Sequence, residues 1–282
     1  MTDRQNGFPR RLLFGAGGIA LLGGCASATR AAQRAAARAA SPARAVRASA
    51  SASASTRGEA RSGDAAVTAA RAAGHPVEPE HHVRAGPMTL ALTFDDGPSP
   101  VYTDQVLALL RRHRVTATFF LIGENVLKYP DVVRRTLADG HRVGNHTWSH
   151  PDLGRLTGAQ VRDELERTSE LIAGVGRTDP PTLFRAPGGY FTDASLEICA
   201  ELGLRPVSWS VDPEDWSNPG TDAIVDQVLR HARTGSIVLE HDGCLTPDPI
   251  VPGGPADRSQ TVAALADYLP QLIDAGYRFT AV

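Results

Sequence analysis

The feature that most constrains the fold is a short apolar run ending in a cluster of polar residues, repeated along the chain. The first run covers residues 88–94, and Gly97 and Pro98 stop it just after Asp95 and Asp96. Alternation before Gly-Pro is typical of a β-strand that ends in a sharp turn. Two carboxylates this close repel each other, so one would hold a proton unless a cation lay between them. By itself such a pair is more often a solvated turn than a site.

A second cluster contains two histidines. His146 and His150 follow a short run at residues 141–145, and Pro151 comes directly after them. In a helical turn the two imidazoles would share one face, and neutral imidazole is the commonest protein ligand for metals. Two His and one carboxylate form a catalytic set for Zn²⁺ that leaves a position open for water. The proline favours a compact turn, although the spacing also fits two unrelated histidines in a loop.

Three further polar clusters follow apolar runs later in the chain. They lie at residues 185–190, 212–216 and 240–242. Taken singly, each has an ordinary explanation as a surface charge, a loop acid or a histidine at a strand end. Those explanations do not account for the repetition of such clusters after successive strands. In β/α barrels, catalytic residues collect at the carboxyl ends of the strands.

Seven strand-like runs alternate with six helix-like segments. Strands are expected at residues 88–94, 116–122, 141–145, 182–186, 205–211, 235–241 and 277–282. Helices are expected at residues 102–113, 129–139, 158–174, 192–202, 220–233 and 258–275. One-sided apolar stripes on these helices indicate that they cover a sheet. The order predicts an α/β protein with a distorted (β/α)7-type barrel rather than an open doubly wound sheet, and no strand leads into a glycine-rich phosphate loop.

The polar clusters together carry five motifs. From Thr93 to His241 they read Thr-Phe-Asp-Asp-Gly-Pro, His-Thr-Trp-Ser-His, Arg-Ala-Pro, Asp-x-x-Asp-Trp and Leu-x-His. In content and order they resemble the polysaccharide deacetylases with the NodB homology domain, carbohydrate esterase family 4, over residues 88–282. The resemblance implies a distorted (β/α) barrel and a divalent metal, usually zinc and sometimes cobalt or another ion. It also implies removal of acetyl groups from a carbohydrate, most often from N-acetylglucosamine.

The resemblance assigns the first clusters to the metal and the general base. Asp96, His146 and His150 would hold the metal. Asp95 would be the base that takes a proton from the attacking water, and Arg185 would pair with Asp95 and hold it in place. A bound metal lowers the pKa of water and polarises a carbonyl, which suits the hydrolysis of an acetyl group.

The resemblance assigns the last clusters to the general acid and the acetyl pocket. His241 would protonate the leaving amine. Asp215 would hydrogen-bond His241 and keep its proton available near neutral pH. Trp216 and Leu239 would line the pocket for the acetyl methyl group.

The sequence departs from the family pattern at two places. Many relatives have an aromatic residue directly after the motif proline, whereas here Gly188 and Gly189 precede Tyr190. The Gly188 amide is still expected to donate to the oxyanion, and Tyr190 is a candidate for contacting the sugar. Glu240 stands where an apolar residue is common. Strand alternation points Glu240 away from the site toward the helices, where a buried carboxylate needs a partner.

The first 25 residues have the features of an export signal. Arg10 and Arg11 precede an apolar stretch at residues 12–22, which is too short to cross a bilayer as a helix. Cys25 ends a Leu-Gly-Gly-Cys sequence that resembles a bacterial lipobox, which predicts a lipid-anchored protein at the cell surface. The alternative is cleavage near residues 26–28, which would remove Cys25 and secrete the protein.

Composition separates a linker from one catalytic domain. Residues 26–84 are rich in Ala, Arg and Ser and lack the apolar residues for a core, which predicts a disordered linker. Residues 85–282 suffice for a single deacetylase domain. Residues 1–74 hold eleven Arg and three acids, and the formal total is −2, so the remainder carries about −10. An acidic domain argues against nucleic acid as a partner. We expect a monomer without a disulfide, whose only membrane contact is the lipid anchor.

The leading hypothesis is a metal-dependent N-deacetylase that acts on peptidoglycan or a chitin-like polysaccharide. An O-deacetylase such as an acetylxylan esterase could use the same site. A catalytically inactive glycan-binding protein could use the same scaffold, but the presence of Asp95, His241 and all three expected ligands argues against it. The long Gly- and Pro-rich segment at residues 243–255 is expected to form one wall of the glycan groove.

Overall fold

The computed structural model describes residues 78–245 and 249–282. The expected export signal, Cys25 and most of the expected linker lie outside these residues. Within the described part of the chain, no helix combines the length and the apolar character needed to cross a membrane. The two described cysteines, Cys199 and Cys244, are not joined by a disulfide.

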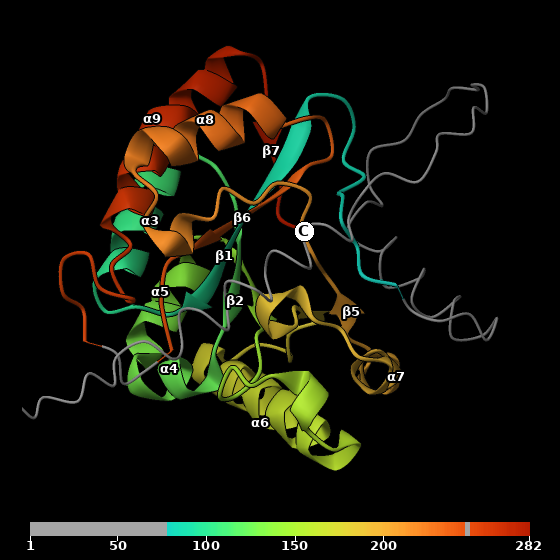
Figure 1. Ribbon diagram of the computed structural model, residues 1–282. Coiled ribbons are helices and arrows are strands. Elements are labelled where there is room, and N and C mark those ends of the chain that lie inside the picture. Colours follow the sequence, from blue (N-terminus) through green and yellow to red (C-terminus); the bar gives the residue numbers. More distant parts are fainter. Residues whose placement is uncertain (1–77, 246–248) are drawn as a thin grey trace, which may run out of the picture.

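A parallel sheet of seven strands forms the centre of the domain (Figure 1). The strands are β1 (Thr89–Gly97), β2 (Thr118–Leu121), β3 (Arg142–Asn145), β4 (Leu183–Phe184), β5 (Arg205–Pro206), β6 (Ile237–His241) and β7 (Arg278–Phe279). Their order is β5-β4-β3-β2-β1-β6, and β7 pairs with the start of β1. The sheet curls until Val211, which follows β5 in the chain, bridges Val238 of β6. The prediction of a distorted α/β barrel is confirmed.

Helices fill the connections between the strands. They are α3 (Tyr102–His113), α4 (Gly123–Lys128), α5 (Pro130–Ala138), α6 (Gly158–Gly176), α7 (Asp193–Leu202), α8 (Thr221–His231) and α9 (Ser259–Asp274). Short 3-10 helices are η2 (Leu153–Arg155), η3 (Pro187–Gly189) and η4 (Asp215–Ser217). Helix α4 was not predicted, because a single short helical segment shows no clear periodicity. The strand predicted at residues 205–211 keeps only its first two residues as β5, and the bridge at Val211 is isolated.

Strand alternation separates two layers of the core. On β1, Leu90, Leu92 and Phe94 face outward and pack in a cluster with residues of α3, α8 and α9, which gather on one side of the sheet (Figure 1). Ala91 faces inward and packs in a second cluster inside the barrel. Since the side chains of a strand alternate, Asp95 is expected on the same inner face as Ala91. Alternation along β1 therefore separates the residues that face the helices from those that face the site.

The folded domain begins earlier than the boundary predicted after residue 84. Glu80 pairs with Val207, and His82 pairs with Ser236, so this segment runs along the seam between β5 and β6. The carboxylate of Glu80 also accepts two hydrogen bonds from the guanidinium of Arg205, at 3.0 and 2.8 Å. Composition predicts residues 78–84 as part of the linker, because a segment held by backbone pairing and one ion pair shows no apolar pattern in the sequence.

Candidate active site

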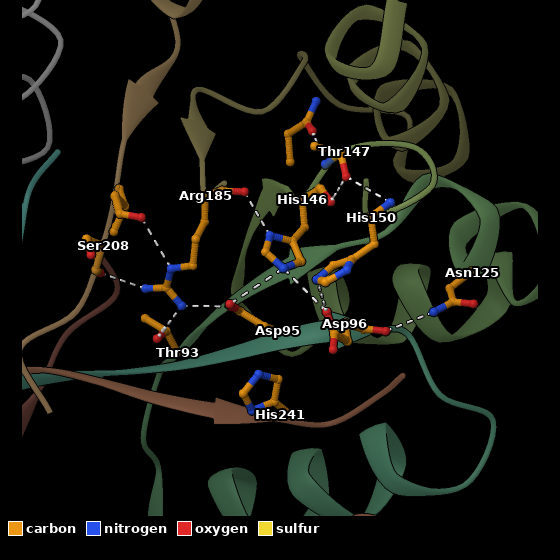
Figure 2. Close-up of polar contacts among 12 residues, drawn as sticks. Thr93, Asp95, Asp96, Asn125, His146, Thr147, His150, Arg185, Ser208 and His241 are labelled. Carbon is orange, nitrogen blue, oxygen red and sulfur yellow. Dashed lines mark hydrogen bonds and ion pairs between the residues drawn. The ribbon is translucent and has the colours of Figure 1, made fainter. Parts of the chain in front are cut away.

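The two adjacent aspartates lie at the carboxyl end of β1, inside the strand rather than after it. The register between β1 and β2 shifts between Asp95 and Gly97. At this bulge Asp96 has a φ of 68°, which is uncommon for a residue other than glycine. A bulge re-aims a side chain that alternation would send to the other face. Both carboxylates consequently point into one site (Figure 2).

His146 and His150 lie in a compact turn after β3, as predicted, but the turn is not helical. Thr147 and His150 have φ values of 68° and 52°. These two left-handed residues bring the imidazole rings to 5.0 Å between centroids. The Nε2 atom of each histidine lies 3.3 Å from Oδ1 of Asp96 (Figure 2).

These three side chains fit a divalent metal ion. Asp96, His146 and His150 each offer one ligand atom, and the three atoms lie within 4.8 Å of one another. Oδ1 of Asp96 is buried and has no hydrogen-bond partner among the described residues, which suits an oxygen that binds a cation. Nδ1 of His146 donates to the carbonyl of Arg185 at 2.8 Å, which directs Nε2 toward the metal position.

The charges of the donor set favour metal binding. Burial opposes ionisation of Asp96, but His150 and His146 outweigh burial and lower the pKa of this carboxyl. Burial lowers the pKa of His150 and so favours its neutral form, against the opposing effect of Asp96. Burial also acts to lower the pKa of His146, but Asp95 and Asp96 outweigh it and raise that pKa. An ionised carboxylate and neutral imidazole are the forms that bind metal, so a bound ion would displace a proton from His146.

Asp95 is held by a buried arginine. Oδ1 of Asp95, which is 3% exposed, accepts a hydrogen bond from Nη1 of Arg185 at 2.7 Å. The guanidinium also donates to Oγ1 of Thr93 at 2.8 Å and to two backbone carbonyls, and it lies over the ring of Phe120 at 4.2 Å. Oδ2 of Asp95 is the oxygen on the side of His146, 3.7 Å from Nε2 of that residue. The expected pairing of Arg185 with Asp95 is therefore present.

His241 at the end of β6 is paired with Asp215, as the family resemblance implied. Nδ1 of His241 donates to Oδ1 of Asp215 at 2.7 Å, so Nε2 is the nitrogen left for a substrate. Oδ2 of Asp215 accepts from the backbone N–H of His241 at 2.8 Å and from Oγ1 of Thr261 at 2.7 Å. Burial acts to lower the pKa of His241, but Asp215 outweighs burial and raises that pKa to about 9.

Gly188 lies in the turn that follows β4. Its φ is 61°, a conformation that glycine adopts without strain. The amides of Gly189 and Tyr190 donate to the carbonyls of Ala186 and Pro187. The Gly188 amide makes no such bond to another described residue, which is compatible with the predicted role as an oxyanion donor.

Trp216 and Leu239, the two residues expected to line the acetyl pocket, differ in how far they are buried. Trp216 follows Asp215 in η4 and is half-buried, and its Nε1 has no hydrogen-bond partner among the described residues. Leu239 is 1% exposed and packs in the inner cluster of the barrel with Phe120 and Trp209. Their contact with an acetyl methyl group, like the contact of Tyr190 with a sugar, stays a prediction.

Several residues that support the site were missed by the sequence reasoning. Thr93 accepts a hydrogen bond from Arg185, and strand alternation places it on the same face as Asp95, so that signal could have found it. Tyr268 of α9 donates to Glu240 at 2.6 Å and is the partner that this buried carboxylate requires. Neither Tyr268 nor Thr261 stands in a motif, so no pattern in the sequence indicates its role.

A pocket of about 310 Å³ opens beside the carboxyl end of β1. It is lined by Pro98, Ser99, Pro100, Asn125, Tyr129, Cys244, Pro249, Ile250 and Ala256. The side chain of Asn125 donates to the carbonyls of Asp96 and Cys244, at 2.8 Å each, and so joins the pocket to the end of β1. The segment expected to form a groove wall therefore contributes several residues to a pocket beside the site.

Comparison with known proteins agrees with this geometry. Residues 82–207 match the family model described as polysaccharide deacetylase. A chitooligosaccharide deacetylase from Sinorhizobium fredii is 46% identical over 192 residues, which cover 68% of this chain and 89% of that protein. This chain belongs to the polysaccharide deacetylase family. The family membership inferred from the five motifs is thus confirmed.

Two further relatives extend the comparison of this deacetylase. A peptidoglycan-N-acetylglucosamine deacetylase from Bacillus cereus is 44% identical over 195 residues, which cover 68% of this chain and 85% of that protein. The crystal structure of a peptidoglycan N-acetylglucosamine deacetylase in complex with a benzamide compound superposes with a TM-score of 0.65 and 34% identity. The superposition covers 72% of this chain and 89% of that one.

Proposed function

We propose that this deacetylase removes acetyl groups from N-acetylglucosamine residues of a cell-wall or chitin-like polysaccharide, with the help of a divalent metal ion. The observation that carries the proposal is the convergence of Nε2 of His146 and of His150 on Oδ1 of Asp96, at 3.3 Å each. The names of the relatives, a chitooligosaccharide deacetylase and a peptidoglycan-N-acetylglucosamine deacetylase, support an N-acetyl substrate.

Asp96, His146 and His150 would hold the ion. Zinc suits two imidazoles and one carboxylate with open positions for water and substrate, and cobalt or another divalent ion is the alternative. When bound there, the ion would lower the pKa of a water molecule and polarise the acetyl carbonyl.

Asp95 would act as the general base. Because Arg185 engages Oδ1 of Asp95, Oδ2 is the oxygen available to accept the proton of the attacking water. The guanidinium fixes the direction of the carboxylate, and precise orientation of a base accounts for much of its effect on the rate. The Gly188 amide would donate to the oxyanion as the carbonyl carbon becomes tetrahedral.

His241 would act as the general acid. Asp215 accepts the hydrogen of Nδ1, which keeps Nε2 directed toward the leaving amine. An amine leaves only when it is protonated, so an imidazolium that retains its proton above neutral pH suits amide hydrolysis.

The substrate class is tested by measuring acetate release from N-acetylglucosamine oligomers, peptidoglycan and acetylated xylan. Release from the first two, and its loss in Asp95→Asn, is the expected result. Release only from xylan would establish the O-deacetylase instead. An absence of release from every substrate, in protein with metal bound, would favour an inactive glycan-binding protein.

The place of action is proposed from the sequence. Export, with attachment to the membrane through a lipid on Cys25, would bring the domain within reach of the wall, and secretion is the alternative. We expect a monomer in either case. Wild-type protein in the membrane fraction and Cys25→Ser protein in the medium would support the anchor, whereas the same distribution for both would contradict it.

A further inference from the structure

The turn that carries the two histidine ligands has a backbone conformation that its residues disfavour. Thr147 and His150 have φ values of 68° and 52°. Left-handed backbone is strained for a residue other than glycine, and it persists only where the surroundings impose it. Some part of the structure must therefore hold this turn.

Side chains and a helix end satisfy the polar backbone groups of the turn. The backbone amide of Thr147 donates to Oδ1 of Asn145 at 2.8 Å. The backbone amide of His150 donates to Oγ1 of Thr147 at 3.1 Å (Figure 2). The first two amides of α4, from Gly123 and Glu124, donate to the carbonyls of Thr147 and Trp148 at 3.0 Å each.

The remaining amides of the turn converge on one carboxylate from α6. The backbone N–H groups of Trp148 and Ser149 both donate to Oε2 of Glu164 at 2.8 Å. The hydroxyl of Ser149 donates to Oε1 at 2.9 Å, so both oxygens of Glu164 are engaged. Successive amides that point to one spot form a concavity for an anion, and here the anion is part of the protein.

Helix α6 holds Glu164 in a fixed place. Val161 and Leu165, its neighbours on the helix, are both fully buried. The side-chain Nδ2 of Asn145 in β3 donates to the carbonyl of Leu165 at 2.7 Å, which joins the helix to the strand that leads into the turn. Arg167 packs over the ring of Trp148 at 4.0 Å.

We propose that Glu164 is a positioning residue for the metal centre. By holding the amides of Trp148 and Ser149, it keeps His146 and His150 oriented toward Asp96. Glu164 is not one of the three side chains that would hold the ion. The inference rests on the proposed metal-dependent function, because it concerns the residues that would hold the ion.

The test is the zinc affinity of the full chain, measured by competition with a chelating dye. Glu164→Ala is expected to weaken zinc binding about 10–100-fold, the usual effect of removing a group that orients metal ligands. Glu164→Gln keeps an acceptor of the same shape and is expected to bind zinc nearly as wild type does. Glu170→Ala, an exposed glutamate on the same helix, is the matched control and should leave the affinity unchanged.

Wild-type zinc affinity in folded Glu164→Ala protein would overturn the inference. If that variant does not fold, Glu164→Asp replaces it, because it keeps the charge but withdraws the carboxylate by one methylene. Weakened zinc binding is then expected, and unchanged binding overturns the inference. If wild-type protein itself binds no zinc and no other divalent ion, the proposed metal dependence fails, and this inference fails with it.

Discussion

Buried charges determine what individual residues of this site can do. Asp95, Arg185, Asp215 and His241 are each no more than 4% exposed. An unpaired charge at such a depth would cost several kcal/mol, and here each charge faces an opposite one. In the proposed mechanism the two pairs have opposite roles, because Asp95 would accept a proton and His241 would donate one. That separation is what an acid and a base working at the same pH require.

The first prediction concerns the acid. Asp215→Asn is expected to move the alkaline limb of the pH profile of kcat/KM to lower pH. His241 must be protonated to donate, and Asp215 raises its pKa to about 9, so activity falls as the pH rises through that value. A bound cation repels the imidazolium and lowers the limb in both proteins, but the difference between them remains. Coincident limbs would show that Asp215 does not control His241.

The second prediction concerns Glu240, which faces α9 as strand alternation indicated. Burial raises the pKa of Glu240 well above its ordinary value, so Glu240 keeps its proton in the folded protein to a higher pH than in the unfolded chain. In the unfolded chain it ionises above about pH 4.3, so unfolding releases a proton and is favoured as the pH rises. Glu240→Gln should therefore gain Tm relative to wild type as the pH rises from about 4.3 toward the raised pKa of Glu240. A constant difference in Tm across that interval would contradict this account.

At the scale of elements, the parallel register assembles the site from distant segments. β1 pairs with β2, β6 and β7, and Asp95 lies directly opposite His241 of β6. β3, which leads into the histidine turn, pairs with the other side of β2. The carboxyl ends of these strands share one edge, so clusters far apart in the sequence meet there. The sheet is therefore the part of the structure that converts motif order into site geometry.

The third prediction concerns the segment before β1. Glu80→Ala removes the carboxylate that accepts two hydrogen bonds from Arg205, and Arg205 is only 9% exposed. Leaving such a donor unpaired costs about 1–3 kcal/mol, and each kcal/mol lowers the Tm of a domain this size by about 2–4 °C. Glu78→Ala, at an exposed position, is the control. Equal Tm values for the two variants would show that this segment does not stabilise the domain.

For the whole molecule, the sequence predicts the barrel and the motif residues better than it predicts the residues that hold them in place. The barrel and the aspartates and histidines of the site follow from strand alternation and from motifs at strand ends. The segment around Glu80 could not be predicted, because an edge held by backbone bonds has no apolar pattern. Glu164 and Thr261 lie on helices at positions where only the three-dimensional packing gives them a partner. The side chain of Asp96 points into the site only because of the bulge in β1, and the strand pattern in the sequence does not reveal that bulge.

The fourth prediction concerns the pocket beside the site. Shortening the segment at residues 249–255 is expected to change the preference for oligomer length, because Pro249 and Ile250 line the pocket. Long loops of a compact domain commonly have such a role. The measurement is kcat/KM for N-acetylglucosamine oligomers of increasing length. Proportional changes at every length would argue that this segment does not contact the glycan.

The most direct test of the account is whether acetate release depends on an ion held by Asp96, His146 and His150. Wild-type protein and His150→Ala would be freed of metal with a chelator and then titrated with zinc, using an N-acetylglucosamine oligomer as substrate. We predict that wild-type release is lost on chelation and returns with about one equivalent of zinc, whereas His150→Ala stays inactive at that concentration. Undiminished acetate release from the metal-free wild-type protein would contradict the account.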